Sequence, residues 1–275
     1  MLEILKVEKQ DKNLISRILT FLYRDPTLYS YMIHCCYSPL ISVEYYVALR
    51  NEQIEGLLFK TNELKYPTIY LAGSLTAIET LLDSVHLNNK LIFRSIEDSL
   101  MPIVESKFDV RAKYRENLMV CFKETFSPMF MHKPRKLGLE DLECVSKILK
   151  KTICETRKLI EMEHQIMYGI INEQGDIVSF ASTEVILPEV ATIGNVFTAP
   201  AYRNRGMAKS VVSAVTQDAL ERSRLCNLFV RENNMSAVRV YSALGYKPKK
   251  ITWWLDVGQN DGQWSGVVDQ SDIPT

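Results

Sequence analysis

The chain has 275 residues, a length that suits one large domain or two of medium size, and 47% of its residues are hydrophobic, enough for a substantial core. Its 33 lysines and arginines balance 33 aspartates and glutamates, so the net charge indicates neither a nucleic-acid partner nor an acidic membrane partner. No stretch approaches the roughly 18 apolar residues of a membrane-spanning helix, and the amino-terminal MLEILKVEKQDKN lacks the apolar centre of a signal peptide, which favours a cytoplasmic protein.

The cysteines and histidines show none of the spacings of a metal site. The six cysteines contain no CxxC pair, and the four histidines have neither i,i+4 nor acid-paired spacing. We therefore expect no bound metal, and we expect the cysteines to be buried thiols in a reducing compartment. The cysteines are Cys35, Cys36, Cys121, Cys144, Cys154 and Cys226.

The first half of the chain alternates helical and strand-like patterns. Apolar residues at helical spacing behind a capping aspartate predict a helix from Asp11 to about Arg24. Thr76 and Glu79 fit a capping box at the start of a later helix. The other elements predicted in this half are a helix at 27–36, strands at 43–50, 54–62 and 68–73, a helix at 76–86, a strand at 90–96, a helix at 97–108 that starts late or kinks at Pro102, and a strand at 116–124.

A break in this pattern, ETFSPMFMHKPRK, indicates a domain boundary, because Pro128 and Pro134 interrupt both helices and strands. We expect one module at 1–127 and a second at 128–275. The order of elements then restarts with a helix at 139–153, strands at 164–172, 176–187 and 189–199, a helix from 205 to about 223, a strand at 225–230, a helix at 236–244 and a strand at 249–257.

The two halves share one order of elements, which is helix, antiparallel strands, helix, strand, helix, strand, without evident sequence identity. This repeat predicts an α+β protein of two tandem modules. Each module would have a mixed, largely antiparallel sheet flanked by helices.

The stretch FTAPAYRNRGMAKSVV, residues 197–212, joins a predicted strand to a predicted helix that Gly206 opens. The first turn of a helix has unpaired N–H groups and a partial positive charge, which favour a phosphate. A glycine lets such a ligand approach the backbone, and Arg203 and Arg205 add positive charge beside it. The alternative is an ordinary strand-to-helix turn whose arginines are solvated.

Two motifs in this part of the chain resemble those of the GNAT superfamily of acyl-CoA-dependent N-acyltransferases. The first, Arg203-x-x-Gly206-x-Ala208, is similar to the family's loop for the coenzyme A pyrophosphate. The second is similar to the family's Asn-Ala-Tyr-Leu-Gly signature and comprises Asn234, Ala237, Tyr241, Leu244, Gly245 and Tyr246. The resemblance covers about residues 137–256, where the two motifs occur in the family's order.

The resemblance implies a sheet that opens between the strand ending near Thr198 and the strand at 225–230, with acetyl-CoA as a cosubstrate in the gap. It also implies that Asn234 contacts the pantetheine arm or fixes the following helix. The residues expected to bind acetyl-CoA are Val196, Phe197, Thr198, Arg203, Arg205, Gly206, Met207, Ala208 and Asn234. Tyr241 would donate a proton to the departing thiol, although helical spacing alone also fits a core tyrosine.

A protonated acceptor amine also needs a base. Glu184 is the candidate, because a carboxylate within the apolar run SFASTEVIL must be paired or face a cavity, unless strand alternation points it to solvent. Asn195 occupies a strand position that can hold a carboxylate in relatives of the family, so the identity of the base stays open.

The first half lacks both motifs. GSLTAIE, which follows the strand at 68–73, has neither an arginine nor a second small residue at the loop spacing. We therefore expect a degenerate GNAT-like copy that shapes the acceptor pocket or the interface between the modules.

The sequence thus predicts an acyl-CoA-dependent N-acetyltransferase that moves an acetyl group to a primary amine by direct attack in a ternary complex. We expect a small-molecule acceptor, since two modules suit an enclosed pocket. The alternatives are a non-catalytic acyl-CoA sensor or interaction module, and a protein N-acetyltransferase. The sequence indicates no nucleic-acid or membrane partner, and the oligomeric state does not follow from it.

Overall fold

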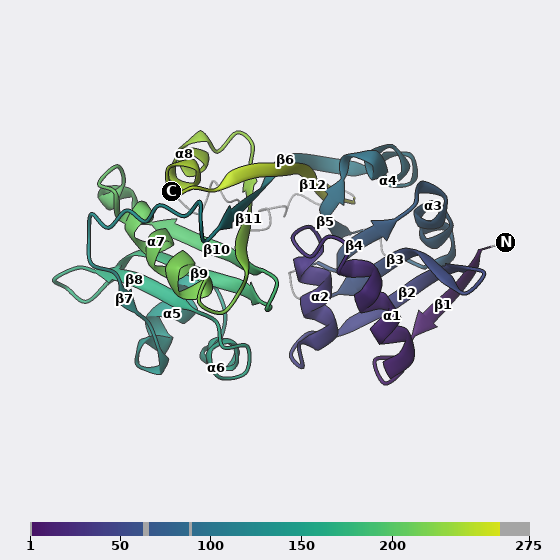
Figure 1. Ribbon diagram of the computed structural model, residues 1–275, viewed down its shortest axis with the longest axis horizontal. Coiled ribbons are helices and arrows are strands. Elements are labelled where there is room, and N and C mark those ends of the chain that lie inside the picture. Colours follow the sequence, from purple (N-terminus) through teal and green to yellow (C-terminus); the bar gives the residue numbers. More distant parts are fainter. Residues whose placement is uncertain (1, 63–65, 88–89, 259–275) are drawn as a thin grey trace. The chain divides into compact units, whose positions relative to one another are not determined.

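The computed structural model describes residues 2–62, 66–87 and 90–258, and the chain forms two compact units (Figure 1). Unit 1 extends to Glu116 and includes the chain again from Ile251, whereas unit 2 extends from Asn117 to Lys250.

This division differs from the sequence-based boundary between residues 127 and 128. The division between Glu116 and Asn117 falls inside one strand, β6 (Val110–Phe122), and the strand continues through it without interruption. The last strand, β12 (Lys247–Val257), also contributes to both units. Its second part pairs antiparallel with a strand of unit 1, where Thr252 lies opposite Glu97. Register between distant strands decides this pairing, and local sequence patterns do not reveal it.

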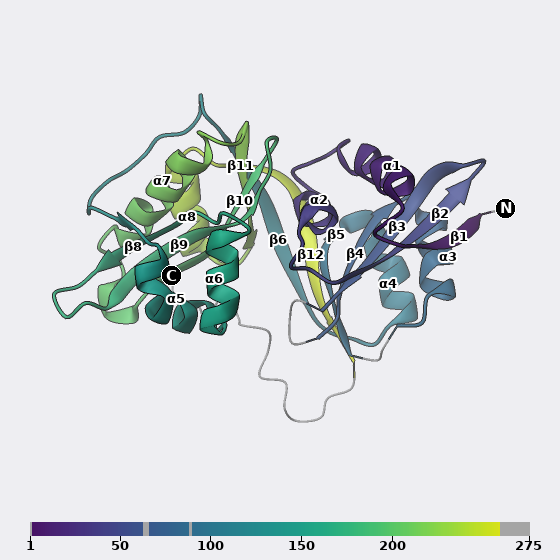
Figure 2. The ribbon, with the colours of Figure 1, turned by 90° about the horizontal axis from the view of Figure 1, so that it is seen from below.

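Unit 1 is a mixed sheet with helices on both faces. Its strands are ordered β1-β2-β3-β4-β5-β12. Figure 2 shows α1 and α2 on one face of this sheet and α3 and α4 on the other. In chain order the elements of unit 1 are β1 (Glu3–Val7), α1 (Lys12–Leu22), α2 (Ser30–Tyr37), β2 (Val43–Arg50), β3 (Gln53–Thr61), β4 (Thr68–Gly73), α3 (Leu75–Ser84), β5 (Leu91–Glu97) and α4 (Met101–Lys107).

Most of these elements follow the sequence-based prediction, and the differences have local causes. Asp11 caps α1, and its Oδ1 accepts a hydrogen bond from the N–H of Leu14 at 3.0 Å. The predicted capping box is wrong, because Ser74 caps α3 through a hydrogen bond from the N–H of Ala77. The short strand β1 was not predicted, since its exposed edge position needs no apolar alternation.

Unit 2 has strands ordered β6-β11-β10-β9-β8-β7. Its sheet carries α7 on one face, with α5 and α6 on the other (Figure 2). In chain order its elements after β6 are β7 (Arg135–Lys136), α5 (Leu142–Leu149), α6 (Ile153–Glu161), β8 (Met167–Ile171), β9 (Ile177–Ile186), β10 (Ala191–Thr198), α7 (Met207–Ala219), β11 (Leu225–Arg231) and α8 (Met235–Ala243).

The single helix predicted at 139–153 is two helices in the structure. Lys150 has a φ of 53°, a left-handed conformation that ends α5. Thr152 then caps α6 and forms a capping box with Glu155. α5 ends at Leu149 and α6 begins at Ile153, so the spacing of apolar residues does not reveal the short break between the two helices.

The core of unit 2 lies between α7 and the sheet. The apolar side of α7 is fully buried there. Its members are Val211, Val212, Val215 and Ala219. The connection from β10 to α7 therefore leads into a helix packed firmly on the core. A binding site at the start of α7 requires such support.

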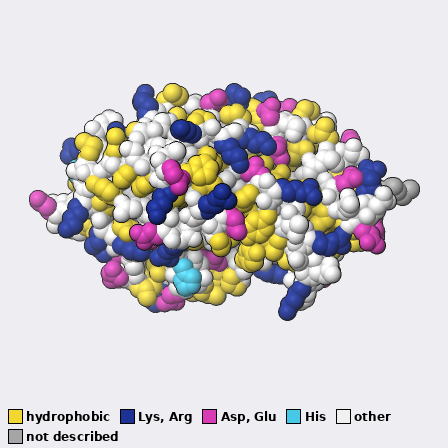
Figure 3. All heavy atoms as spheres, in the orientation of Figure 1, with side chains coloured by type: hydrophobic (Ala, Val, Ile, Leu, Met, Phe, Trp, Pro, Cys, Tyr) yellow, Lys and Arg dark blue, Asp and Glu magenta, His cyan; other side chains and the backbone are white. Residues whose placement is uncertain are grey.

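The surface charge and the cysteines complete this description. The face in Figure 3 carries lysine and arginine side chains interspersed with aspartates and glutamates. The cysteine prediction holds for four side chains, whereas Cys144 and Cys154 are exposed on α5 and α6. In the described part of the chain, no helix has the length and apolar content needed to span a membrane.

Candidate active site

The strands β10 and β11 separate partway along their length. They run parallel and pair at Ala191 with Cys226 and at Thr192 with Asn227, but β10 continues to Thr198 against β9 alone. A bulge bends β10 after Gly194, and Asn195 within it has a φ of 51°. This is the gap in the sheet that the family resemblance implied.

The helix α7 begins beside this gap with its first turn uncapped. Gly206 is its N-cap residue, with a φ of 80°, and no side chain accepts a hydrogen bond from the first-turn N–H groups. A side chain at position 206 would therefore be strained. The free N–H groups and the helix dipole make this end of α7 suitable for an anion.

The space beside Gly206 holds a side chain from the preceding connection. A β carbon added to Gly206 would lie 2.3 Å from Met131 Sδ. The N–H groups of Met131 and His132 both donate to Ser210 Oγ at 3.0 Å, which fixes this connection along α7. The missing side chain of Gly206 leaves room for Met131, and the binding of an anion at this helix start stays a prediction.

A cavity of about 390 Å³ opens where the end of β10 approaches the start of α7 and one side of α8. Several residues predicted to bind acetyl-CoA or to act in catalysis line it, namely Val196, Thr198, Gly206, Met207, Ala208 and Tyr241. The two GNAT-like motifs, some 35 residues apart from Gly206 to Tyr241, therefore meet in one cavity.

The other predicted binding residues lie around the cavity without lining it. Phe197 packs on the opposite face, against the core beneath α5 and α6. Arg203 donates from Nε to the carbonyl of Thr198 at 3.3 Å, and the exposed Arg205 lies over the ring of Tyr202. Asn234 caps α8, with Oδ1 accepting from the N–H of Ala237 at 3.2 Å, so it does fix the following helix.

Ala237 of the signature also lines the cavity, together with residues to which the sequence assigned no role, namely Met131, Tyr202, Asn204, Lys209, Ser236, Arg239 and Val240. Ala237 lies one helical turn before Tyr241 and shares its side of α8, whereas Ser236, Arg239 and Val240 have no such spacing from Tyr241. Met131 had no such signal, because its place depends on how the connection before β7 folds back over α7.

Tyr241 is both a core residue and a cavity residue. Its side chain is 7% exposed, and its ring meets that of Tyr246 edge-on at a centroid distance of 6.0 Å. Burial raises the pKa of the Tyr241 phenol, and the negative charge of Glu184 raises this pKa further. The phenol therefore keeps its proton at neutral pH, as a proton donor must.

Glu184 lies at a break in the pairing of β9 with β10. Thr192 pairs with Val185 and Ile193 with Thr183, so Glu184 is an extra residue between them. A bulge interrupts the alternation of side chains, and the simple alternation that would send Glu184 to solvent does not hold. The half-buried carboxylate lies over the bare Cα of Gly194 and acts electrostatically on Tyr241.

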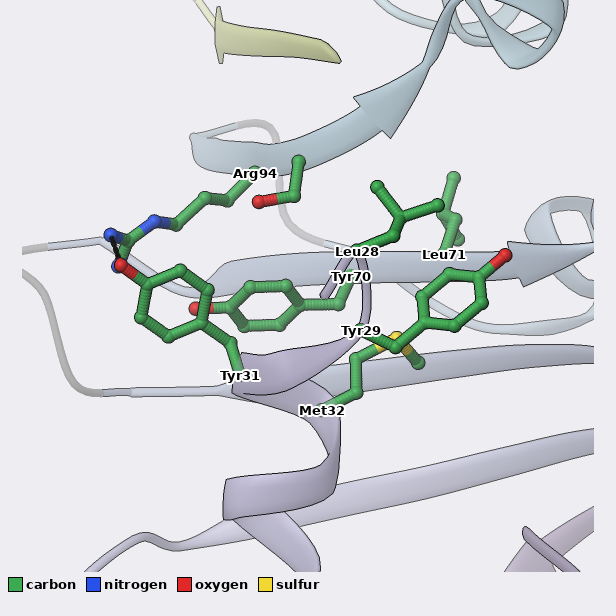
Figure 4. A pocket seen from close by; sticks show the side chains of 8 residues that line it. Leu28, Tyr29, Tyr31, Met32, Tyr70, Leu71 and Arg94 are labelled. Carbon is green, nitrogen blue, oxygen red and sulfur yellow. Dashed lines mark hydrogen bonds between the residues drawn. The ribbon is translucent and has the colours of Figure 1, made fainter. Parts of the chain in front are cut away.

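Unit 1 has a corresponding pair of strands, but the space beside them is filled. β4 and β5 run parallel and pair at Thr68 with Ile92 and at Ile69 with Phe93. Beyond these pairs the space holds the side chains of Tyr31, Met32, Tyr70 and Arg94, and the Arg94 guanidinium lies 3.9 Å from the centre of the Tyr31 ring (Figure 4). The gap is closed by the protein's own aromatic residues.

The helix that follows β4 also differs from α7. Ser74 caps α3 with its own hydroxyl, which leaves fewer first-turn N–H groups for a ligand. A β carbon on Gly73 would lie 2.3 Å from the carbonyl oxygen of Glu55, so this turn is packed against β3. Unit 1 therefore lacks the open helix start that unit 2 has.

Among the described residues, no group of three or more histidine, cysteine, aspartate or glutamate side chains is placed to hold a metal ion.

Comparisons with solved structures place this architecture among tandem proteins. A Drosophila protein superimposes with a TM-score of 0.71 at 11% identity, over 94% of this chain and 99% of that one. A tandem GNAT protein from the clavulanic acid biosynthesis pathway gives 0.66 at 12% identity, over 95% of this chain and 100% of that one. A GCN5-related N-acetyltransferase from Sphaerobacter thermophilus gives 0.63 at 12% identity, over 93% of this chain and 94% of the other. At these identities the likeness establishes the fold.

No curated protein matches the chain. The model of the family described as "Acetyltransferase (GNAT) family" matches residues 137–246, which contain the parted strands, the uncapped helix start and Tyr241. A domain of the acetyltransferase (GNAT) family therefore lies at residues 137–246, within a fold of two tandem GNAT-like modules.

Proposed function

We propose that this protein transfers the acetyl group of acetyl-CoA to a primary amine of a small molecule, by direct attack in a ternary complex. The observation that carries the proposal is the single cavity in which the uncapped start of α7 and the phenol of Tyr241 meet.

The cavity suits a nucleotide thioester in shape and in polarity. The N–H groups of Met207 and Ala208 at the start of α7 would hold the pyrophosphate, with Lys209 adding positive charge beside them. Val196 and Thr198 on β10 would contact the pantetheine arm where the strands have parted. The thioester, when bound, would supply the acetyl group.

Glu184 and Tyr241 divide the proton transfers between them. Glu184 takes a proton from the protonated amine, which frees the nitrogen lone pair to form the new C–N bond. Tyr241 gives its phenol proton to the sulfur as the C–S bond breaks, so coenzyme A leaves as a thiol. As the amide forms, its nitrogen releases a second proton, which restores the phenol of Tyr241, and Glu184 releases its proton to solvent.

The electrostatic link between the two groups gives this sequence an order. While Glu184 is charged, it raises the pKa of Tyr241 and holds the phenol proton in place. Once Glu184 has taken the amine's proton, that charge is gone and Tyr241 becomes a stronger acid. The phenol thus releases its proton most readily after the amine has been deprotonated.

The proposal of a small-molecule acceptor rests on the position of this pair. Glu184 is half-buried and Tyr241 is 7% exposed, so a small amine would reach them more easily than a side chain held on a protein surface.

A panel of amines tests the function directly. Purified protein is incubated with acetyl-CoA and each amine, and free thiol is measured against a Gly206→Trp control, in which the start of α7 is blocked. We expect thiol release with at least one small primary amine. Binding of acetyl-CoA without thiol release from any amine would favour a sensor, and release only with peptides would favour a protein acetyltransferase.

We further propose that unit 1 is a degenerate module without an acyl-CoA site of its own. The filled space beside β4 and β5 and the capped start of α3 support this. Calorimetric titration should give one acetyl-CoA per chain, and two equivalents would contradict the proposal. We also propose a reducing, cytoplasmic location, which the exposed thiols of Cys144 and Cys154 favour because they would oxidise readily elsewhere.

A further inference from the structure

We infer that Gly194 is a positioning residue of this enzyme, because its missing side chain makes the place in which the Glu184 carboxylate lies. The inference rests on the proposed role of Glu184 as the base and adds the device that aims it.

Two irregularities in the pairing of β9 with β10 bring the residues together. On β9, Glu184 is the extra residue between Thr183 and Val185. On β10, the register shifts again after Gly194, where Asn195 takes a left-handed conformation. Each bulge rotates the local side chains away from regular alternation, and bulges are common beside active sites for that reason.

The carboxylate occupies the space directly above Gly194. A β carbon added at this position would lie 2.5 Å from both Cδ and Oε1 of Glu184 and 2.7 Å from its Cγ. A β carbon does not approach a non-bonded carbon or oxygen atom so closely. Any side chain at position 194 therefore moves the carboxylate to another place.

The same contacts indicate that an alanine at position 194 moves the carboxylate without unfolding the chain. The nearest atoms to the added carbon belong to the far end of a flexible side chain. Gly194 has no left-handed backbone conformation that would strain an alanine, unlike Gly206 with a φ of 80°. The low-energy response is rotation of Glu184 to a different rotamer.

The bulge on β10 has its own support, so it does not depend on Gly194. Asn195 donates from Nδ2 to Ser182 Oγ at 3.0 Å, which ties the bulged residue back to β9. Gly194 lies opposite Ser182 in this register. An alanine at position 194 would thus leave the strand in place and change the carboxylate.

Gly194→Ala tests the inference through steady-state kinetics. A misplacement of about 1 Å costs roughly 100-fold in rate, so we expect kcat to fall by about 10- to 100-fold, with the KM for acetyl-CoA within about threefold of the wild type. Gly169→Ala is the matched control, since its β carbon would meet only the side chains of Leu137 and Ile177 in the same sheet.

A double-mutant cycle separates this role from a general structural one. In a Glu184→Ala background the clash has no partner, so adding Gly194→Ala should reduce kcat by less than about twofold. Multiplied losses in the double variant would overturn the inference, as would wild-type kcat in Gly194→Ala. Should Gly194→Ala fail to fold, the double variant must still fold, and failure in both backgrounds would also overturn it.

The failure of the proposed base has a different signature. Wild-type turnover in Glu184→Ala would remove Glu184 from the mechanism and with it the premise of this inference. Slow Glu184→Ala together with unaffected Gly194→Ala would leave the base in place and reject Gly194 alone.

Discussion

The thioether of Met131 lies against Gly206 at the mouth of the cavity, in the space where any other residue would carry its β carbon. The two residues are far apart in the sequence and meet because the connection before β7 folds back along α7, held by Ser210 and Ser213. Met131 is 66% exposed, so its side chain covers the helix start without being part of a core.

We expect Gly206→Ala to weaken acetyl-CoA binding by about tenfold or more, since it combines a left-handed backbone cost of about 1 to 2 kcal/mol with the contact to Met131. Calorimetric titration measures the affinity. Adding Met131→Ala removes the contact but not the backbone cost, so the double variant should recover part of the affinity.

Gly175→Ala provides the matched control for that prediction. Gly175 also has a positive φ, of 90°, but nothing lies within 4 Å of an added β carbon. It should lose stability with acetyl-CoA affinity unchanged. Unaltered affinity in Gly206→Ala would contradict the role given to the start of α7.

Tyr241→Phe should slow turnover by about 100- to 10,000-fold, the usual contribution of a positioned acid. The ring and its packing against Tyr246 remain, so acetyl-CoA affinity should stay within about threefold of the wild type. Single-turnover kinetics and calorimetric titration separate the two effects. Equal turnover in the variant would remove Tyr241 from the mechanism.

Asn234→Ala should destabilise the protein by about 1 kcal/mol, the typical cost of losing an N-cap, because the Oδ1 atom that accepts from Ala237 is removed. Denaturant unfolding measures the difference. Asn233→Ala is the control, since the exposed Asn233 side chain precedes the cap, and Asn234→Asp should restore most of the loss. A loss as large in Asn233→Ala would argue against the cap.

The cysteines should react with a disulfide reagent in two classes. Burial raises the pKa of Cys121 to about 11 and that of Cys36 to about 12, so few of these groups are thiolate at pH 8. Cys144 and Cys154 are exposed and should react within the first phase. Titration with Ellman's reagent before and after unfolding counts the thiols in each class. Rapid reaction of all six thiols in the folded protein would contradict this division into two classes.

The same shifts predict a loss of stability in alkali. A thiol whose pKa is raised above its ordinary 9.0 in the folded state makes its full contribution to the free energy of unfolding below pH 9. The thiol is then protonated in both the folded and the unfolded state. The contribution falls as the pH rises from 9 towards 11, since unfolding then frees the thiols to ionise. Cys121→Ser should flatten this part of the profile of unfolding free energy against pH. An unchanged slope would show that Cys121 does not carry it.

The sequence by itself determined what depends on neighbouring residues. The order of most elements, the Asp11 cap and the glycine at the start of α7 follow from backbone conformation and capping chemistry within a few residues. Each of the two family-like motifs also lies within one short segment of the sequence. Together they identified several of the residues that line the cavity.

Only the tertiary structure decided the arrangements that depend on strand register and on contacts between distant segments. Two bulges direct Glu184 away from the alternation its strand would otherwise follow, Met131 reaches Gly206 from a separate connection, and β12 pairs with β5 of unit 1. A one-residue shift in register reverses the direction of a side chain, and no pattern within the strand records which register the folded sheet adopts.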